Sequence, residues 1–431
     1  MEKIERALEK LVRWAERNEM VSLGLIFGVG WVAKLAFFAY FPGSFIVRYD
    51  AYLYLMKSLE IVRGDWAPLR THPLGLSVFA APFFYLVGSP SIFVNMVWAN
   101  MISLTLGALV VLPLHFLCRM LMGVRGALLA SAIVSVSYWY ALSSMGFGNE
   151  PLFALLLVAT AFFLVKMRDD GRYVLHAACA GSLSYWVRPN GIVLLPVIIL
   201  SAVLARRHIP KFRWAPVMHA SIIFIAISSP FLWQRYAHFG SPLDYGENSR
   251  YGASDYAEAW SAREAPPSLG DRLAGFSIAD YADKFGVRGL GAMAFILLML
   301  TVPLSVFFVW GGAVTAADAS FLPIHLVFGA WIASFLPIFH FMGVPRHFFP
   351  LIPFACIYIV AGIGHIAREN RYRRLFAVCA AAMAIPFFAV GLIHPEYYWL
   401  PSSLNDMAFG RWAASHVRGK IAIGRNNDLI M

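Results

Sequence analysis

Charged residues are scarce in this chain of 431 residues. Only 14% of the sequence is Asp, Glu, Lys or Arg and 60% is hydrophobic, whereas soluble domains carry roughly a quarter charged residues. This composition excludes a water-soluble globular protein. Apolar runs of about 20 residues recur along the sequence, long enough to cross a ~30 Å hydrocarbon layer, where helices satisfy the main-chain polar groups. We therefore predict an all-α, polytopic transmembrane helical bundle.

Cysteine is nearly absent, and so are several catalytic signatures. The four cysteines, Cys118, Cys179, Cys356 and Cys379, fall within apolar runs or at their ends, so neither a disulfide framework nor a metal–thiolate site is implied. The sequence also has no Gly-rich nucleotide loop, no zinc-ligand spacing and no serine nucleophile elbow. A soluble nucleotide-sugar or ATP site therefore has no support.

About eleven segments are predicted to span the membrane. They are residues 20–42, 91–118, 125–145, 150–166, 173–188, 191–205, 214–234, 288–311, 320–341, 347–366 and 373–393. A further apolar segment, 74–88, is short and contains Pro82, and we predict an extracytoplasmic juxtamembrane or re-entrant helix there. The basic residues in the short links then lie on the cytoplasmic side, as the positive-inside rule requires. If residues 74–88 crossed the membrane, these basic residues would lie on the extracytoplasmic side, against that rule.

This topology divides the chain into five regions. They are an amphipathic membrane-surface helix (1–19), a transmembrane module (20–234) with a first extracytoplasmic loop (43–90), an extracytoplasmic loop that caps a cavity (235–287), C-terminal transmembrane helices (288–393) and a short extracytoplasmic tail (394–431). The net charge of +11 resides largely in the cytoplasmic links. It therefore does not indicate a nucleic-acid partner.

Ionisable residues gather on the predicted extracytoplasmic face. Asp50 lies in "FIVRYDAYLYL", Glu150 in "GFGNEPLFALLL", Arg188 in "YWVRPNGIVLLP", and Arg346 with His347 in "GVPRHFFPLIP". Such residues are costly at membrane depth unless they are paired or solvated, so they indicate function. A carboxylate can deprotonate a hydroxyl, and a guanidinium binds phosphate in a bidentate manner. The combination favours transfer chemistry on a lipid phosphate.

Each of these residues also has a structural interpretation. Asp50 is compatible with a helix N-cap, and Glu150 followed by Pro151 with an ordinary first helical turn. Arg188 and Arg346 are compatible with side chains that reach from the membrane to the interface. Their occurrence together on one face carries more weight than any one of them.

Four short motifs, in order, add a family resemblance. "RYDAYLYL", "THPLG", "NEPLFALLL" and "VRPNG" cover roughly the first 200 residues, which resemble the GT-C superfamily of polytopic glycosyltransferases. That group includes protein O-mannosyltransferases, aminoarabinose transferases of lipid A and glycolipid-anchor mannosyltransferases. The resemblance implies an inverting membrane glycosyltransferase with a polyprenyl- or dolichyl-phosphate sugar donor and a lipid, glycan or protein acceptor on the extracytoplasmic face.

The resemblance also implies roles for individual residues. Asp50 is expected to be the general base and Glu150 the second acidic residue of a catalytic pair. The expected contacts to the donor phosphate are Arg188, Arg346, His347, His72 and Arg48. The expected contacts to the acceptor or the sugar are Tyr49, Tyr52, Tyr245 and Tyr251. No metal ligands are predicted, and a requirement for a divalent ion (Mg²⁺ or Mn²⁺) stays open.

Three other functions are compatible with parts of the pattern. A lipid or solute transporter also uses polar residues in a helical bundle, but no internal repeat is evident. An O-antigen-ligase-type enzyme shares the large external loop but does not explain Asp50, and a structural subunit explains none of the polar residues. The short loops favour a prokaryotic plasma membrane over the endoplasmic reticulum, with a cytoplasmic N-terminus and an extracytoplasmic site and C-terminus. The sugar and the acceptor are not specified by the sequence.

Overall fold

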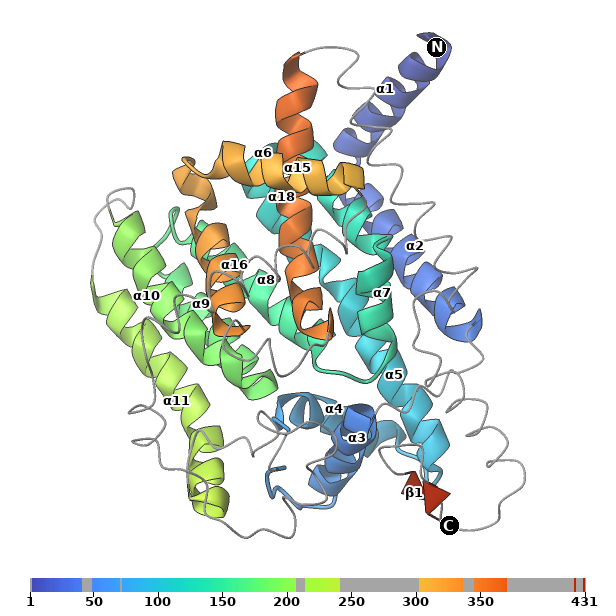
Figure 1. Ribbon diagram of the computed structural model, residues 1–431, viewed down its shortest axis with the longest axis vertical. Helices are drawn as coiled ribbons and strands as arrows, with labels where there is room; N and C mark the ends of the chain where they lie inside the picture. The colour runs from blue at the N-terminus through green and yellow to red at the C-terminus, as the bar shows by residue number, and fades with distance from the viewer. Residues whose placement is uncertain are drawn as a thin grey trace.

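The protein is almost entirely helical in the part of the chain that this computed structural model describes (Figure 1). The described residues are 2–40, 49–69, 72–206, 214–240, 302–335, 345–369, 422–423 and 429–430. Within them the only strands are β1 (Ala422–Ile423) and β2 (Leu429–Ile430), which pair in antiparallel orientation. The all-α class predicted from the sequence is confirmed.

Apart from the charged, amphipathic first helix, the helices share high apolar content, and most of them have lengths of three turns or more. In chain order they are α1 (Glu2–Arg17), α2 (Glu19–Tyr40), α3 (Tyr49–Val62), α4 (Gly75–Val87), α5 (Ile92–Leu109), α6 (Val111–Ser135), α7 (Tyr138–Met145), α8 (Glu150–Lys166), α9 (Tyr173–Val187), η1 (Pro189–Val193), α10 (Leu194–Ala205), α11 (Trp214–Phe239), α15 (Val302–Thr315), η4 (Ala319–Phe321), α16 (Leu322–Phe335), η5 (Pro345–Leu351) and α18 (Ile352–Glu369).

Several of these helices are long and apolar enough to cross a membrane. In the described residues they are Glu19–Ala36, Val94–Ser135, Trp214–His238 and Phe348–Ala367, with the bent pair Leu304–Thr315 and Ala319–Ser334 as a further candidate. These helices agree with an integral, polytopic membrane protein, but they do not confirm the predicted count of eleven spans. The predicted span 373–393 and the first part of 288–311 lie outside the described residues.

The segment Val94–Ser135 reverses direction at Gly123. This glycine has φ +76° and ψ −178°, a conformation outside the helical region. In a straight helix His115 and Ser131 would lie about 24 Å apart, yet His115 Nδ1 and Ser131 Oγ are 3.5 Å apart. Farther from the turn, Ser103 Oγ donates to the Gly146 carbonyl. The two arms are therefore antiparallel, which matches the predicted separate spans 91–118 and 125–145.

Replacing Gly123 with Ala is expected to lower the free energy of unfolding by about 1–3 kcal/mol, because a Cβ is strained at this φ and ψ. Gly24→Ala is the matched control, since that glycine lies in helix α2 and an added Cβ there would have no neighbouring atom within 4 Å. Denaturant-induced unfolding of the purified variants in detergent measures both effects. Equal stability of the two variants would contradict the inferred strain.

The corner between α1 and α2 is attached to the Gly123 turn by charged side chains. Arg125 binds the Glu16 carboxylate through Nε and one terminal nitrogen. Glu19 accepts from His115 Nε2 at 2.8 Å and lies 3.2 Å from Arg119 Nε. The first helix also exposes large apolar side chains, namely Leu11, Val12 and Trp14. These contacts place α1 at one end of the bundle, at the top of Figure 1.

Helices α3 and α4 form a separate layer at the opposite end, beneath α8 and α9 in Figure 1. Helix α4 has 13 residues, about 20 Å, which is shorter than a ~30 Å hydrocarbon layer. The start of α4 packs closely on the end of α9: a Cβ added to Gly75 would lie only 2.5 Å from the Trp186 carbonyl. The short helix predicted at 74–88 is thus present, and its packing brings the loop before α4 close to the residue that ends α9.

Candidate active site

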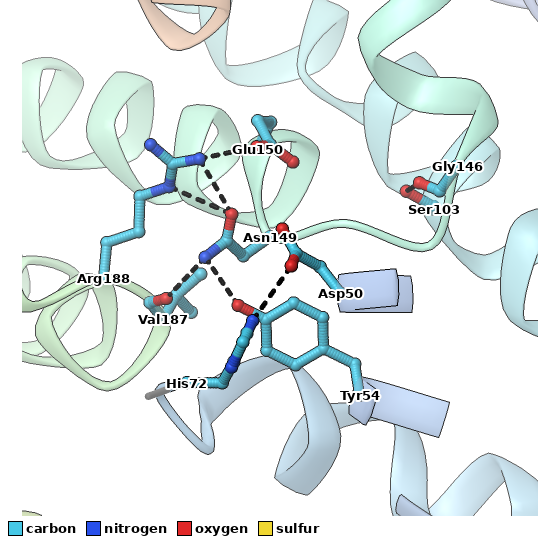
Figure 2. A network of polar contacts seen from close by, with 9 residues as sticks. All are labelled: Asp50, Tyr54, His72, Ser103, Gly146, Asn149, Glu150, Val187 and Arg188. Atoms are coloured by element: carbon cyan, nitrogen blue, oxygen red, sulfur yellow. Dashed lines mark hydrogen bonds and ion pairs between the residues drawn. The ribbon is translucent and has the colours of Figure 1, made fainter. Parts of the chain in front are cut away.

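Two carboxylates lie in one polar network at the α3–α4 end of the bundle (Figure 2). Asp50 is in the first turn of α3 and Glu150 in the first turn of α8. Both positions place an acid near the positive end of a helix, in agreement with the structural interpretation of these residues as helix-start residues. The network nevertheless does more than cap helices, because each carboxylate has a nitrogen partner from a distant segment.

The partner of Asp50 is His72, from the loop before α4. His72 Nε2 lies 3.0 Å from Asp50 Oδ1. The Asp50 side chain is 24% exposed and the His72 side chain 13%, so this pair lies at the edge of the buried network and within reach of solvent. A carboxylate only accepts hydrogen bonds, so the imidazole donates from Nε2.

The partner of Glu150 is Arg188, which directly follows α9 and has extended backbone dihedrals. One terminal nitrogen of Arg188 lies 2.6 Å from Glu150 Oε1, and both side chains are nearly inaccessible, at 7% and 5%. The guanidinium also lies 5.8 Å from the ring centre of Phe153, whose ring is 4.3 Å from that of Trp331. This is a buried, aromatic-lined ion pair, and its opposite charges offset each other.

Asn149 and Tyr54 join the two pairs. The Asn149 amide oxygen accepts from Arg188 Nε at 3.0 Å and from a terminal nitrogen at 2.9 Å. Its amide nitrogen donates to the Tyr54 hydroxyl at 3.0 Å and to the Val187 carbonyl at 3.2 Å. The Tyr54 ring in turn meets the His72 ring edge to face, with centroids 5.4 Å apart. One continuous set of contacts therefore runs from Glu150 to Asp50.

The sequence prediction missed both of these connecting residues. Tyr54 follows Asp50 by four positions in α3, a spacing that places two side chains on the same face of a helix. Asn149 immediately precedes Glu150 in the "GNEP" turn. The spacing of Tyr54 from Asp50 and the position of Asn149 next to Glu150 could have suggested that they belong to the site. Neither feature indicates which groups contact each other.

Arg235 is a further charged residue near this end of the bundle that the sequence prediction did not assign. It lies on α11 and its side chain is fully buried. One terminal nitrogen donates to the Leu69 carbonyl at 3.3 Å, three residues before His72. The guanidinium thus connects α11 to the loop that carries His72. The feature of the sequence that could have identified Arg235 is its position within the apolar stretch "SSPFLWQRYAHF".

The other predicted site residues are only partly described. Tyr52 is 40% exposed and lies two residues from Asp50 in α3. Arg346 and His347 belong to η5, which packs against α8. Their side chains, like that of Tyr49, lie outside the described part of the structure, as do Arg48, Tyr245 and Tyr251 entirely.

The described residues do not fit a divalent metal ion. They contain no group of three or more His, Cys, Asp and Glu side chains that could hold one. The Glu150 carboxylate is bound by the Arg188 guanidinium at 2.6 Å, and a positive group at that distance competes with a cation.

Comparisons with known proteins give a partial family match and a fold. The sequence model of the dolichyl-phosphate-mannose-protein mannosyltransferases matches residues 71–233, which contain His72, Glu150 and Arg188 but not Asp50. No curated protein sequence matches the chain. The family match therefore covers less than half of the chain.

Three solved structures share the fold at low sequence identity. The Archaeoglobus fulgidus oligosaccharyltransferase in complex with Zn and sulfate is 16% identical, with a TM-score of 0.55 over 85% of this chain and 52% of that one. Its counterpart AglB from the same organism, in complex with an inhibitory peptide and a dolichol-phosphate, is 13% identical, with a TM-score of 0.51 over 86% and 56%. ArnT from Cupriavidus metallidurans, bound to undecaprenyl phosphate, is 12% identical, with a TM-score of 0.55 over 94% and 73%.

These neighbours are GT-C membrane proteins, so the predicted resemblance is confirmed at the level of the fold. The chain spans about half the length of the two oligosaccharyltransferases, 52% and 56%. Its activity does not follow from the fold alone.

Proposed function

We propose that this chain, an integral membrane protein with the fold of the GT-C glycosyltransferases, transfers a sugar from a polyprenyl- or dolichyl-phosphate donor to a hydroxyl group of a lipid, glycan or protein. The observation that carries the proposal is Asp50, a partly exposed carboxylate at the rim of the bundle, held by His72 at 3.0 Å. A base at this position can activate an acceptor hydroxyl beside the sugar of a donor whose lipid tail stays in the bilayer. The lipid phosphates bound by AglB and ArnT support this donor class.

The proposed reaction is a single displacement at the anomeric carbon. Asp50 takes the proton of the acceptor hydroxyl as that oxygen bonds to the carbon. The bond between the carbon and the phosphate oxygen breaks, and its electron pair leaves on the lipid phosphate. Attack from the face opposite the leaving group inverts the configuration of the carbon. The products are the glycosylated acceptor, the free lipid phosphate and protonated Asp50.

Glu150 is proposed to act through Arg188 and Asn149 rather than on the acceptor proton. Its carboxylate is nearly inaccessible and bound to Arg188 at 2.6 Å, whereas Asp50 is partly exposed and open to a substrate hydroxyl. The pair instead holds Asn149, which reaches Tyr54 on the helix that carries Asp50. The proposed role of Arg188 is therefore to fix this network next to the donor phosphate.

Positive groups outside this pair are proposed to stabilise the leaving phosphate. Arg346 and His347 are suited to it because η5 packs against α8, and Arg48 because it precedes α3. A guanidinium can bind two phosphate oxygens at once and stabilise the developing charge. Tyr49, Tyr52, Tyr245 and Tyr251 remain proposed contacts for the sugar or the acceptor.

We place the site on the extracytoplasmic face of a prokaryotic plasma membrane. Residues 20–234 are proposed as the catalytic module, residues 235–287 as a loop that covers the cavity, and residues 394–431 as a short tail. The α1 helix, with its exposed Leu11, Val12 and Trp14, is proposed to lie on the cytoplasmic membrane surface.

The test is reconstitution of the purified protein in liposomes with a panel of polyprenyl-phosphate sugars that differ in the sugar. We expect one donor to give time-dependent release of polyprenyl phosphate or transfer of sugar to added acceptor, and the productive donor identifies the sugar. A parallel series with EDTA, with and without added Mg²⁺ or Mn²⁺, determines whether a metal is required. Inactivity with every donor would contradict the proposal and favour a transporter or a ligase that uses a diphosphate-linked donor.

A further inference from the structure

We infer that Arg235 is a positioning residue for the proposed transfer reaction, and that it acts on the site by fixing the loop that carries His72. This inference rests on the proposed function and deepens it. The loop joins α3 to α4 and comprises residues 63–74, of which residues 70 and 71 lie outside the described part of the structure. We call it the His72 loop.

Arg235 is a costly residue for packing alone. It lies on α11 with its side chain fully buried, and a buried cation requires hydrogen bonds or an opposite charge to offset the loss of water. An apolar side chain of similar size would pack α11 against the bundle at lower cost. The guanidinium donates to the Leu69 carbonyl at 3.3 Å, a main-chain group of the His72 loop. The arginine therefore gives this loop a fixed point.

The same face of α11 holds the other end of the His72 loop. Phe231 precedes Arg235 by four residues, so both side chains lie on one face of the helix, and the guanidinium lies 5.8 Å from the Phe231 ring centre. Phe231 also belongs to a small, fully buried apolar cluster with Leu74. His72 lies between Leu69 and Leu74, so the chain on either side of it is attached to α11.

This face of α11 is itself attached to the end of α9. Trp186 Nε1 donates to the Ile227 carbonyl at 2.7 Å, and the Trp186 ring stacks on that of Phe231 with centroids 5.6 Å apart. Arg188 follows Trp186 by two residues. The helix face that holds the His72 loop is thus fixed relative to the Arg188 side of the polar network.

The position of the loop matters because His72 lies 3.0 Å from Asp50 (Figure 2). Residues 65–69 belong to no helix or strand, so contacts such as that with Arg235 determine where this part of the chain lies. Three residues of chain span at most about 10 Å, so a shift of Leu69 carries over to the imidazole. A displacement of about 1 Å can cost about 100-fold in rate. Loss of Arg235 should therefore lower transfer through His72.

A double-mutant cycle with His72→Ala tests whether Arg235 acts through His72. Arg235→Met removes the donor groups, and Arg235→Lys keeps a cation without the planar guanidinium. In the wild-type background we expect kcat/KM for the donor to fall about 100-fold with Met and about tenfold with Lys. In the His72→Ala background each change should cost no more than about twofold, because the group that the loop positions is already absent.

The measurement is single-turnover transfer of the productive donor with enzyme in excess, which resolves slow rates. Losses of the same size in both backgrounds would overturn the inference, since independent effects are additive. The Lys variant supplies a complete cycle of its own if Arg235→Met does not fold.

Lys34→Met is the matched control for removal of a buried cation. Lys34 is also fully buried and donates to a main-chain carbonyl, that of Ser135, at 3.1 Å. Its helix α2 and the partner helix α6 contribute no residue to the polar network that links Asp50 to Arg188. The variant should lower the thermal midpoint, yet its transfer rate per folded molecule should stay within about twofold of wild type. A loss of transfer as large as that of Arg235→Met would overturn the inference.

Hydrogen–deuterium exchange gives a measurement that needs no substrate. Peptides that cover residues 63–75 should exchange faster in Arg235→Met than in wild type, because the loop opens more often, and at the wild-type rate in Lys34→Met. Unchanged exchange in Arg235→Met would overturn the attachment of the loop. If wild type acts on no donor, the proposed function fails and the positioning role fails with it. If wild type is active and the cycle is additive, the positioning role alone is wrong.

Discussion

Asp50→Asn is expected to reduce kcat for sugar transfer by about 10²- to 10⁴-fold, the usual contribution of a positioned general base. Asn keeps the size of the side chain and can still accept from His72 through its amide oxygen. It cannot take a proton from the acceptor hydroxyl. The fall should therefore appear in kcat, with the donor KM and the thermal midpoint close to those of wild type. Single-turnover transfer in liposomes measures the chemical step directly.

Asp65→Asn is the matched control for this change. Asp65 lies in the loop after α3, on the same side of the molecule, and accepts the Ala67 main-chain N–H at 2.9 Å. That hydrogen bond, together with the Lys57 ammonium, lowers the pKa of the Asp65 carboxyl below its ordinary value. We expect the Asp65 variant to transfer sugar at the wild-type rate. Full activity of Asp50→Asn would exclude Asp50 as the base.

Arg188→Met is expected to destabilise the protein by about 3–5 kcal/mol, because it leaves the Glu150 carboxylate buried without its positive partner. The two side chains are 7% and 5% exposed, so water cannot replace the guanidinium. Asn149 also loses both of its bonds from Arg188. Denaturant-induced unfolding in detergent micelles measures the loss, and transfer activity should fall with it as the network loosens.

The double variant Arg188→Met/Glu150→Gln separates the burial of a charge from the loss of packing. It should recover part of the stability lost in Arg188→Met, since no unpaired charge remains. Arg125→Met serves as the control on an exposed pair with Glu16, where the Arg side chain is 70% exposed. Surface ion pairs typically contribute about 1 kcal/mol or less, so we expect a loss of that size. Similar losses in the Arg188 and Arg125 variants would contradict the buried-pair interpretation.

The sequence was sufficient to predict the helical membrane fold and to select Asp50, Glu150 and Arg188 for one face. Apolar runs and charge asymmetry act over tens of residues, so they are visible without a structure. The turn near Gly123 was also predictable, because the apolar residues around it are too many for one span and the link between the two predicted spans carries Arg119 and Arg125. The short helix α4 was predictable because the apolar run 74–88, which contains Pro82, is too short to span.

Which side chains pair with each other could not be predicted from the sequence. Glu150 and Arg188 were predicted as separate functional groups, whereas the structure joins them at 2.6 Å across 38 residues of sequence. The phosphate contact predicted for His72 stays a prediction, whereas its contact with Asp50 at 3.0 Å was not predicted. Such contacts depend on how helices pack, which local pattern does not determine. Arg235 was missed for a related reason: its position at the end of an apolar segment resembles that of an interfacial residue, and only the packing of α11 reveals its burial.

The order of the network residues along the chain has a consequence for biosynthesis. Asp50, Tyr54, His72, Asn149, Glu150 and Arg188 all come from the first half of the sequence. A chain is synthesised and inserted from its N-terminus, so these contacts can form while residues 302–369 are still unmade. The later segments then close on a site that already exists: Trp331 reaches Phe153, and Ser334 accepts from Asn190. Ribosome-bound chains that end soon after α11 would therefore already hold the carboxylate pairs, before the remaining helices complete the bundle.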